Sequence, residues 1–274
     1  MEREREFTFT PKDFQFIRKL VAEQTGIALS EAKTHMVYSR LSRRLRSLNI
    51  PTFAQYCDYL TGDNSEELTH FINAITTNLT AFFRENHHFE HLAHTLLPEL
   101  FATKTKRRVR IWSAGCSTGE EPYSIAVVLR ENMPKNGGWD IKVLATDLDS
   151  NVVAKAASGI YQESSLNGVS QTRIKKYFSR TGKTGQLTVK PEIRELITFK
   201  QLNLMHDWPM KGPFDVIFCR NVVIYFNLDT QRKLFRRYAS ILADKGHLFI
   251  GHSETLYKVS DDFELLGSTI YQKK

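Results

Sequence analysis

The sequence has few cysteines and no long apolar run. Its three cysteines, Cys57, Cys116 and Cys219, form no C-x-x-C pair, and we expect reduced, mostly packed thiols. No apolar stretch approaches the length of a membrane span, and the opening Met-Glu-Arg-Glu-Arg-Glu lacks the apolar core of a signal peptide. We therefore expect a cytoplasmic protein that does not insert into membranes.

The sequence also lacks a recognised metal motif. His87, His88, His91 and His94 lie close together on one predicted helix, and His87 and His91 have the i, i+4 spacing of a chelating pair. No further acid or cysteine stands at the spacing of a known metal motif, so we prefer to interpret these residues as a solvated helix face. We predict that the chain binds no metal.

The chain is long enough for one large domain and a smaller one, and its charge is positive. With 274 residues it can bury a substantial core. A formal net charge of +8 at pH 7 indicates an acidic partner. Nucleic acid, anionic lipid and acidic protein all remain open on this observation alone.

Two patterns divide the chain. Residues 9–75 show helical periodicity without a strand signal, which predicts an all-α domain over residues 1–78, including the start of a linker. Beyond about residue 105, β-type runs alternate with helical stretches, which predicts an α/β domain over 79–274 with a mostly parallel sheet covered on both faces. The predicted strands cover 109–112, 141–145, 196–202, 214–219 and 247–250, and the helices between them cover 123–131, 151–158 and 230–242. Turn signals add a small β insertion at about 160–195 and a closing hairpin at 263–271.

The first two helices have recognisable ends. Thr10 followed by Pro11 predicts the start of the first helix, and Thr25-Gly26 predicts its end. A second helix is expected from about Ser30 to Leu48, with one apolar stripe.

A small-residue turn after the first predicted strand is typical of a nucleotide-type cofactor site. Gly115 and Gly119 follow the strand, and a helix begins directly after them at the edge of the sheet where such cofactors bind. Glu120 and Glu121 stand where the phosphates of a dinucleotide would lie, and like charges there are unfavourable. S-adenosylmethionine, which carries an ammonium and a sulfonium, fits these acids better. The alternative is an ordinary strand-to-helix connection whose acids favour the helix dipole.

Polar residues follow two further predicted strands. Asp147 ends the second strand, where an acid can accept both ribose hydroxyls of a nucleoside cofactor, although Asp147 or Asp149 could instead cap the helix near Asn151. Asn221 follows a buried strand and could supply hydrogen bonds in a ligand crevice, or only cap a turn. Tyr225 lies one turn further on, where a phenol could border a substrate.

The segment that joins the two domains is more apolar than most linkers. Asn78, Thr80 and Arg84 stand among large apolar residues at positions 79, 82 and 83. We expect the aromatic side chains to hold these polar groups rigidly against the second domain. A purely structural role, with Arg84 paired to an acid, is the alternative.

One face of the second predicted helix is basic. Lys33, Arg40, Arg43 and Arg44 lie within about 100° of one another beside the apolar stripe. No acidic residue occurs from position 32 to position 57. A solvated face is the simpler interpretation, and docking of an acidic partner is the alternative.

Four motifs, in this order, resemble the CheR-type chemotaxis methyltransferases. They are T-T-N-L-T-A-F-F-R-E at 76–85, W-S-A-G-C-S-T-G-E-E-P-Y-S-I-A at 112–126, A-T-D-L-D at 145–149 and F-D-V-I-F-C-R-N-V-V-I-Y-F at 214–226. The resemblance covers nearly the whole chain, and four long motifs are more specific than one glycine turn. It implies a Rossmann-like class I S-adenosylmethionine-dependent methyltransferase fold behind an all-α domain. It also implies methyl transfer to glutamate side chains of chemoreceptors, with S-adenosylhomocysteine as the product.

The resemblance further implies roles for single residues and partners. Arg84 and Tyr225 would border the reacting methyl group. The expected cofactor contacts are Asn78, Thr80, Arg84, Gly115, Glu121, Asp147, Asn203, Leu204, Arg220 and Asn221, and the expected receptor contacts are Lys33, Arg40, Arg43 and Arg44. The receptor contacts would face the acidic helical methylation region and bring the protein to membrane receptor arrays. The insertion resembles a β-subdomain that in some members holds a receptor's C-terminal peptide, but the short turn at 181–185 leaves such tethering open.

Two other classes of function remain open beside the receptor methyltransferase. A nucleic-acid methyltransferase would explain the positive charge, but the sequence shows no RNA-binding module or aromatic stacking series, and we predict no nucleic-acid partner. A catalytically silent adaptor that binds the same cofactor would share every cofactor residue.

Overall fold

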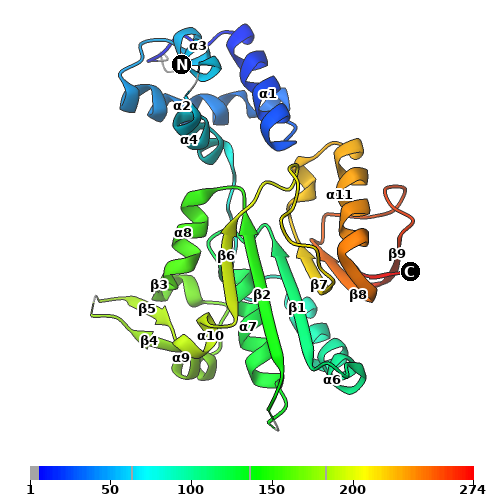
Figure 1. Cartoon of the computed structure of the whole chain (residues 1–274). Helices are drawn as coiled ribbons and strands as arrows, with labels where there is room; N and C mark the ends of the chain where they lie inside the picture. The colour runs from blue at the N-terminus through cyan, green and yellow to red at the C-terminus, as the bar shows by residue number, and fades with distance from the viewer. Residues whose placement is uncertain (1–5, 63, 136, 183) are drawn as a thin grey trace. The chain divides into compact units, whose positions relative to one another are not determined.

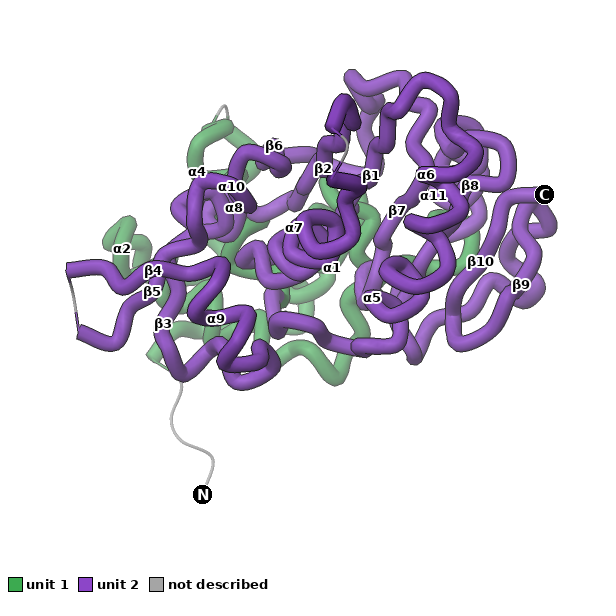
Figure 2. Tube along the Cα trace, turned by 90° about the horizontal axis from the view of Figure 1, so that it is seen from below, with its two compact units in different colours: residues 1–77, 225–230 green, residues 78–224, 231–274 purple. Residues whose placement is uncertain are grey.

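The computed structural model describes residues 6–62, 64–135, 137–182 and 184–274. Residues 1–5 lie outside the described residues, and the prediction that the chain has no signal peptide rests partly on them. Residue 183, within the predicted 181–185 turn, also lies outside the described residues. The chain divides into two units (Figure 2). One unit comprises residues up to Thr77 with Tyr225–Thr230, and the other comprises Asn78–Ile224 with Gln231–Lys274.

The first unit is built from helices. They are α1 (Pro11–Thr25), the 3₁₀ helix η1 (Glu31–Lys33), α2 (Thr34–Leu48), α3 (Phe53–Thr61) and α4 (Ser65–Ile75). Ile17, Leu41, Phe53 and Phe71, one from each α-helix, are fully buried in a single core. The predicted all-α architecture is therefore confirmed. The second helix begins at Thr34 and not at about Ser30, because residues 31–33 form a 3₁₀ turn.

The ends of α1 follow from its local sequence. Thr10 Oγ1 accepts a hydrogen bond from the Asp13 amide at 3.2 Å, and Asp13 Oδ2 accepts one from the Thr10 amide at 2.7 Å. Pro11 supports this reciprocal cap because the first helical position needs no amide donor. Gly26 ends the helix with φ of 75°, and its amide donates to the Ala22 carbonyl at 2.9 Å. Both predicted ends of this helix are confirmed.

The second unit contains a seven-stranded sheet with the order β6-β2-β1-β7-β8-β10-β9 (Figure 1). The strands are β1 (Arg108–Ala114), β2 (Asp140–Asp147), β6 (Ile197–Gln201), β7 (Phe214–Cys219), β8 (Leu242–Ile250), β9 (Phe263–Gly267) and β10 (Ile270–Lys273). The first five strands in this order pair in parallel, and β10 pairs antiparallel with both β8 and β9. The mostly parallel sheet and its closing hairpin are thus confirmed.

Helices cover both faces of this sheet. Ile111 and Trp112 are neighbours on β1, so their side chains point to opposite faces. Ile111 belongs to the same core as Ile125 of α7 (Glu120–Asn132), whereas the ring of Trp112 lies 5.3 Å from that of Tyr238 on α11 (Leu228–Ile241). Further helices are α5 (His87–His91), the π-helix η2 (Leu92–Leu96), α6 (Leu97–Thr103), α8 (Ser150–Ser158), α10 (Pro191–Arg194) and the 3₁₀ helix η4 (Val223–Tyr225). Among the described residues, no helix combines the length and the apolar character that crossing a membrane requires.

The predicted insertion carries a separate small sheet. Its strands β3 (Ile160–Gln162), β4 (Phe178–Arg180) and β5 (Gln186–Val189) are antiparallel, with β5 in the middle. The 3₁₀ helix η3 (Glu163–Leu166) and α9 (Gln171–Tyr177) lie between β3 and β4 in the chain. Tyr161, Phe178, Leu187 and Val189 pack into the main core of the second unit, which anchors the small sheet.

Candidate functional site

Four of the predicted site residues follow strands whose carboxyl ends meet at one edge of the large sheet. Gly115 follows β1, Asp147 ends β2, Asn203 comes after β6 and Asn221 comes after β7. The strand register aligns these ends, since Ala114 pairs with Thr146, and Asp147 pairs with Gln201. The strand order reverses between β1 and β7, which is where open α/β sheets bind their ligands.

The turn between β1 and α7 requires both of its glycines. Gly115 has φ of 112°, and a Cβ there would stand 2.4 Å from Cγ2 of Val222. Gly119 has φ of 99°, and a Cβ there would stand 2.9 Å from the Cβ of Ala156. Any larger residue would thus strain the backbone and collide with a neighbour. The turn is consequently fixed close against the loop that follows β7.

Of the two acids at the end of β2, Asp149 has the predicted capping role, and the contact of Asp147 with a ribose stays a prediction. Asp149 caps α8, because its Oδ1 accepts the Asn151 amide at 2.9 Å. The Asp147 carboxylate accepts the amides of Ser117 at 2.7 Å and Asp149 at 3.1 Å, which ties β2 to the glycine turn. A carboxylate has about four acceptor positions, so these two bonds do not use all the positions of Asp147. Burial raises the pKa of Asp147, as expected for an acid in an enclosed site.

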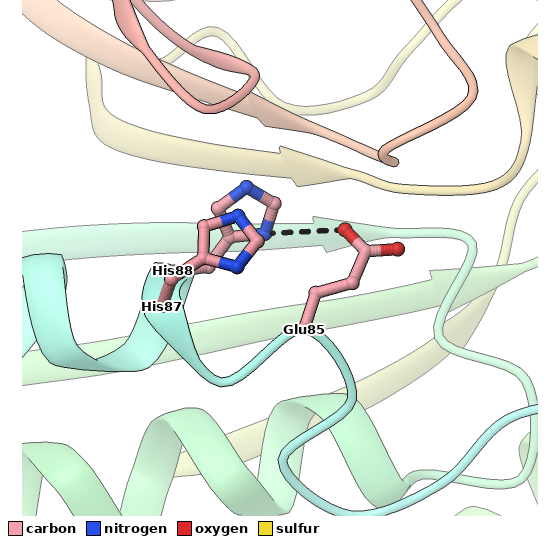
Figure 3. A group of neighbouring side chains, drawn as sticks. All are labelled: Glu85, His87 and His88. Atoms are coloured by element: carbon pink, nitrogen blue, oxygen red, sulfur yellow. Dashed lines mark ion pairs between the residues drawn. The ribbon is translucent and has the colours of Figure 1, made fainter.

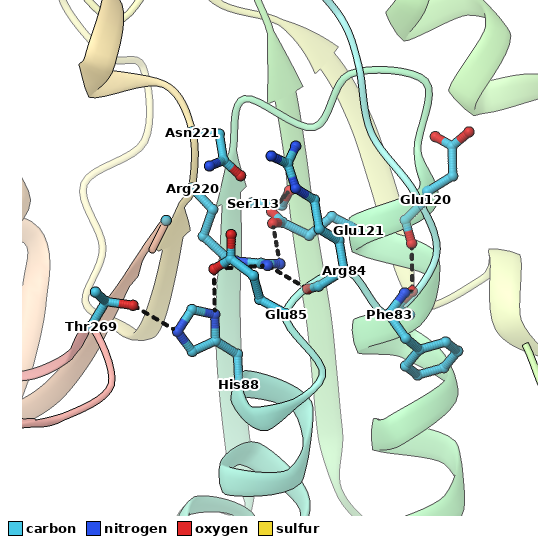
Figure 4. A network of polar contacts seen from close by, with 12 residues as sticks. Phe83, Arg84, Glu85, His88, Ser113, Glu120, Glu121, Arg220, Asn221 and Thr269 are labelled. Carbon is cyan, nitrogen blue, oxygen red and sulfur yellow. Dashed lines mark hydrogen bonds and ion pairs between the residues drawn. The ribbon is translucent and has the colours of Figure 1, made fainter. Parts of the chain in front are cut away.

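A buried ion network includes Ser113 and Glu121, which stand on either side of the glycine turn in the sequence (Figure 4). Glu121 accepts a hydrogen bond from Ser113 Oγ at 2.8 Å and from Arg220 Nη1 at 3.1 Å. Nη2 of Arg220 lies 3.3 Å from Glu85 Oε2 and donates to the Arg84 carbonyl oxygen. Burial raises the pKa of Glu121, and the Arg220 charge opposes that rise. The predicted cofactor residue Arg220 therefore uses two of its guanidinium nitrogens to hold protein groups.

Arg84 is flanked by two residues in the left-handed backbone region. Phe83 has φ of 53° and Glu85 has φ of 56°, and each such non-glycine conformation costs on the order of 1 kcal/mol. Part of this cost at Phe83 is offset by a hydrogen bond that its backbone amide donates to Ser124 Oγ at 3.0 Å. Nη1 of the partly buried Arg84 donates to the Leu79 carbonyl at 3.1 Å. Figure 4 shows the Arg84 side chain pointing away from the buried network below it.

The aromatic residues of the 78–84 segment pack as the sequence predicts. The ring of Phe82 lies 4.9 Å from that of Tyr161, and the ring of Phe83 lies 5.3 Å from that of Phe89. Asn78 is held at both ends: its side-chain amide donates to Asp149 at 2.8 Å, and its carbonyl accepts from Ser117 at 2.8 Å. Thr80 is partly buried in the same segment. Phe82 and Phe83 are therefore part of the second unit's core, and Asn78 is fixed to the loops around it.

Asn203 and Leu204 lie in the loop after β6. The Asn203 side-chain oxygen accepts the Met205 amide at 2.9 Å, which makes a tight turn. The Leu204 carbonyl accepts the indole N–H of Trp208 at 3.3 Å and a bond from Arg237, whose guanidinium lies 3.9 Å from the Trp208 ring centroid. This loop is thus ordered by contacts within the second unit.

Glu85, His87 and His88 form a group whose candidate metal-ligand atoms lie within 4.8 Å of one another (Figure 3). Burial lowers the pKa of His88 to about 3, so its imidazole is neutral near pH 7 and donates through Nε2 to the Ser268 carbonyl at 3.1 Å. Nδ1 of His88 lies 3.6 Å from Glu85 Oε2. Arg220 already places a positive charge 3.3 Å from that oxygen, which opposes a second cation. The absence of a metal stays a prediction.

Two of the four basic residues predicted to meet a receptor have partners inside the first unit. Arg40 Nη1 donates to the carbonyl oxygens that end α4, at 2.7 Å and 2.6 Å. Arg44 makes two bonds to the Glu67 carboxylate, with Nε 3.0 Å from Oε1 and Nη2 2.5 Å from Oε2. Lys33 and Arg43 are exposed. The basic face therefore contains two structural residues beside two that are accessible to a partner.

Tyr225 belongs to the first unit, although it lies far from that unit in sequence. Its carbonyl oxygen accepts the Ala28 amide at 2.8 Å, and the following Phe226 forms an antiparallel bridge with Ile27. These contacts explain why residues 225–230 pack with the helices. The role of the Tyr225 phenol beside a reacting methyl group stays a prediction.

Sequence reasoning missed the segment Gly251–Glu254, which follows β8. His252 Nδ1 lies 2.9 Å from Glu85 Oε1, and the buried Glu254 carboxylate accepts backbone amides of the loop after β7. The signal was present, because polar residues directly after a buried strand are the pattern that pointed to Asn221. Applied to the strand ending at Ile250, the same rule would have found Glu254.

The charges at this sheet edge fit S-adenosylmethionine better than a dinucleotide. Asp147 and Glu121 are acidic, and the Arg220 guanidinium is committed to Glu121 and Glu85. A pyrophosphate would meet carboxylates here, whereas an ammonium or sulfonium would be attracted to them. Asp147 has acceptor positions for ribose hydroxyls, and Asn78, Asn203 and Asn221 offer amide groups around the same edge. The residues present thus fit this cofactor.

Comparison with known proteins agrees with the geometry. Residues 12–76 match the family model "CheR methyltransferase, all-alpha domain", and residues 78–272 match "CheR methyltransferase, SAM binding domain". The chain is 45% identical to a "Probable chemotaxis protein methyltransferase" of Rhizobium etli, covering 92% of this chain and 96% of that one. It is 44% identical to "Chemotaxis protein methyltransferase 2" of Pseudomonas aeruginosa (97% and 94% covered) and 43% identical to the "Chemotaxis protein methyltransferase" of Escherichia coli (94% and 89% covered). This chain belongs to the CheR methyltransferase family, with an all-α domain followed by an S-adenosylmethionine-binding methyltransferase domain.

Proposed function

We propose that this chain transfers the methyl group of S-adenosylmethionine to glutamate side chains in the cytoplasmic helical methylation region of chemoreceptors. The products are glutamate methyl esters and S-adenosylhomocysteine. Family membership and the names of the relatives support the substrate class. The structural observation that carries the proposal is the pair of acids, Asp147 and Glu121, at the carboxyl edge of the sheet. The side chain of Arg84 lies near this edge and points away from the buried ion network (Figure 4).

The chemistry needs orientation more than proton transfer. A glutamate carboxylate is ionised near pH 7, so the nucleophile requires no general base. When bound, S-adenosylmethionine supplies an electrophilic methyl group on a good leaving group. Arg84 would hold the substrate carboxylate through a charge-assisted hydrogen bond, and the rigid 82–85 backbone would keep that bond in one direction. Tyr225 would act as a second group that borders the carboxylate.

Labelled methyl transfer distinguishes the three classes of function. The protein is incubated with radiolabelled S-adenosylmethionine and either membranes that contain chemoreceptors or RNA. We expect label on receptor protein that is released by mild base, because methyl esters hydrolyse readily. Base-stable label on RNA would support a nucleic-acid methyltransferase. Cofactor binding without any transfer would support a silent adaptor.

Asp147→Ala should weaken S-adenosylmethionine and S-adenosylhomocysteine alike, because both contain the ribose that Asp147 is proposed to hold. Losing hydrogen bonds to a charged acceptor corresponds to roughly 1.5–3 kcal/mol, or about a tenfold to hundredfold rise in Kd. Calorimetric titration of both ligands measures the effect. Asp261→Ala removes an exposed acid of the same unit and should leave Kd unchanged. If the Asp147 variant binds both ligands with the same affinity as the parent protein, Asp147 is not part of the site.

Reversing Lys33 and Arg43, the two exposed residues of the predicted basic face, should weaken receptor binding and leave cofactor binding unchanged. In Lys33→Glu/Arg43→Glu, the attraction to an acidic receptor helix becomes repulsion, so KM for receptor should rise severalfold at low salt. Added salt should reduce the difference, because exposed charges are screened over about 8 Å at physiological ionic strength. Arg40 and Arg44 are left intact, since they anchor α4.

The matched control for that variant is Lys12→Glu/Arg18→Glu, which changes the charge equally on α1, where both residues are exposed. Steady-state kinetics with receptor-containing membranes measures KM for each protein. If both double variants raise KM by the same factor, net charge alone explains the effect and the basic face has no special role.

A further inference from the structure

Glu254 is a buried carboxylate surrounded by backbone amides. Its side chain is only 6% exposed. Oε2 accepts the amides of Asn221 at 2.9 Å and Gly251 at 2.5 Å, and Oε1 accepts those of Val223 at 2.9 Å and Ile224 at 3.3 Å. These four bonds supply all the acceptor positions of the carboxylate with donors. The charge is therefore stabilised by peptide groups of two loops.

The loop that Glu254 holds would otherwise have few backbone partners. Residues 220–224 leave the sheet after β7, and Asn221 adopts φ of 58°, which is unfavourable for a residue with a side chain. Gly251 allows this conformation, because a Cβ on Gly251 would stand 2.8 Å from the Asn221 amide nitrogen. The loops after β7 and β8 are thus pressed together at Gly251 and joined through the Glu254 carboxylate.

The same short segment also reaches the loop that carries Arg84. His252 Nδ1 lies 2.9 Å from Glu85 Oε1, and Glu85 is the neighbour of Arg84 in the chain. The Gly251–Glu254 segment therefore contacts both the loop that carries Arg84 and the loop that carries Asn221. Residues 252 and 253 of this segment are exposed, so the segment lies partly at the surface of the second unit.

We propose that Glu254 is a positioning residue of the methyl-transfer site, which fixes the backbone of residues 221–224 and so sets the direction of the Asn221 side chain. This inference rests on the proposed function, in which Asn221 contacts the cofactor. Glu254 itself touches neither cofactor nor substrate in this proposal. It acts through the four amides that it accepts.

The test uses Glu254→Gln, which keeps the size of the side chain but points an amide donor at backbone amides that are also donors. Hydrogen exchange should show faster exchange of the 221–224 amides, with exchange in β2 unchanged. Calorimetry well below Tm should show a rise in Kd for S-adenosylhomocysteine of tenfold or more. Glu264→Gln, which removes an exposed acid on β9, is the matched control and should change neither quantity.

A double-mutant cycle with Asn221→Ala separates positioning from general stability. If Glu254 acts through Asn221, Glu254→Gln in the Asn221→Ala background should raise Kd by less than threefold. Full multiplication of the two single effects would overturn the proposal. Glu254→Asp, which keeps the charge on a shorter side chain, serves if the glutamine variant does not fold, and it should give an intermediate Kd.

The remaining outcomes separate this inference from the function on which it rests. A lower Tm with unchanged Kd and unchanged exchange at 221–224 would make Glu254 merely structural and overturn the positioning role alone. If the parent protein itself does not bind S-adenosylhomocysteine, the proposed function fails and the positioning role fails with it. If the parent binds but Asn221→Ala has no effect on Kd, Asn221 is not a cofactor residue and the positioning role is wrong.

Discussion

Arg84→Ala should lower kcat for receptor methylation roughly tenfold to hundredfold, which corresponds to the loss of one charge-assisted hydrogen bond of about 1.5–3 kcal/mol. The effect should fall on kcat because Arg84 is proposed to align the substrate carboxylate with the methyl group. Kd for S-adenosylhomocysteine should change less than kcat. The protein should stay folded, because Ser124 and Arg220 still hold the backbone around Arg84 when the single bond from the Arg84 guanidinium to the Leu79 carbonyl is lost.

Two further variants make this result interpretable. Arg84→Lys keeps the charge but loses the forked donor geometry, so its kcat should lie between those of the parent and the alanine variant. Arg236→Ala removes an exposed arginine from α11 and should leave kcat unchanged. A normal rate of receptor methylation by Arg84→Ala would show that the 78–84 segment is only a packing element.

The site residues at the ends of strands could be predicted from the sequence, because α/β sheets bind ligands at the carboxyl ends of their parallel strands. Parallel strands present their carboxyl ends at one sheet edge, so polar residues after buried strands were expected to converge. Gly115, Asn203 and Asn221 follow strands of the observed sheet, and Asp147 is the last residue of its strand. Which of Asp147 and Asp149 caps α8 was not predictable, since both precede the helix. In the structure Asp149 accepts the Asn151 amide, whereas Asp147 accepts the distant Ser117 amide.

Side-chain partners far apart in sequence could not be predicted. Arg44 on α2 pairs with Glu67 on α4, 23 residues away in the sequence. A helix face that is uniformly basic in the sequence is therefore partly neutralised by an acid of another helix. Arg220 lies 99 residues from Glu121, and neither the sequence spacing nor the composition reveals this pair. Such pairs depend on how helices and strands pack, whereas periodicity and capping are local. The left-handed backbone at Phe83 and Glu85 is equally a product of tertiary contacts.

Arg220→Met should produce the largest loss of stability, about 3–5 kcal/mol, because it leaves two nearly buried carboxylates without their cation. The side chains of Glu85 and Glu121 are 10% and 11% exposed, and Arg220 contacts both. Methionine fills similar apolar volume, so the loss reports charge and hydrogen bonds more than packing. Urea unfolding, followed by fluorescence, measures the change in unfolding free energy. Arg236→Met, on the exposed side of α11, should change it little.

The pH dependence of Arg220→Met separates electrostatics from packing. Burial raises the pKa of Glu121, and removing Arg220 removes the charge that opposes this rise. A group whose pKa is raised in the folded state favours folding below its unfolded pKa, and this contribution is lost as pH rises through the folded pKa. The defect of Arg220→Met should therefore be smaller at pH 5 than at pH 8. Adding Glu121→Gln, which removes the unpaired charge, should recover part of the loss at pH 8. A defect that is independent of pH and unchanged by Glu121→Gln would show that Arg220 contributes through packing alone.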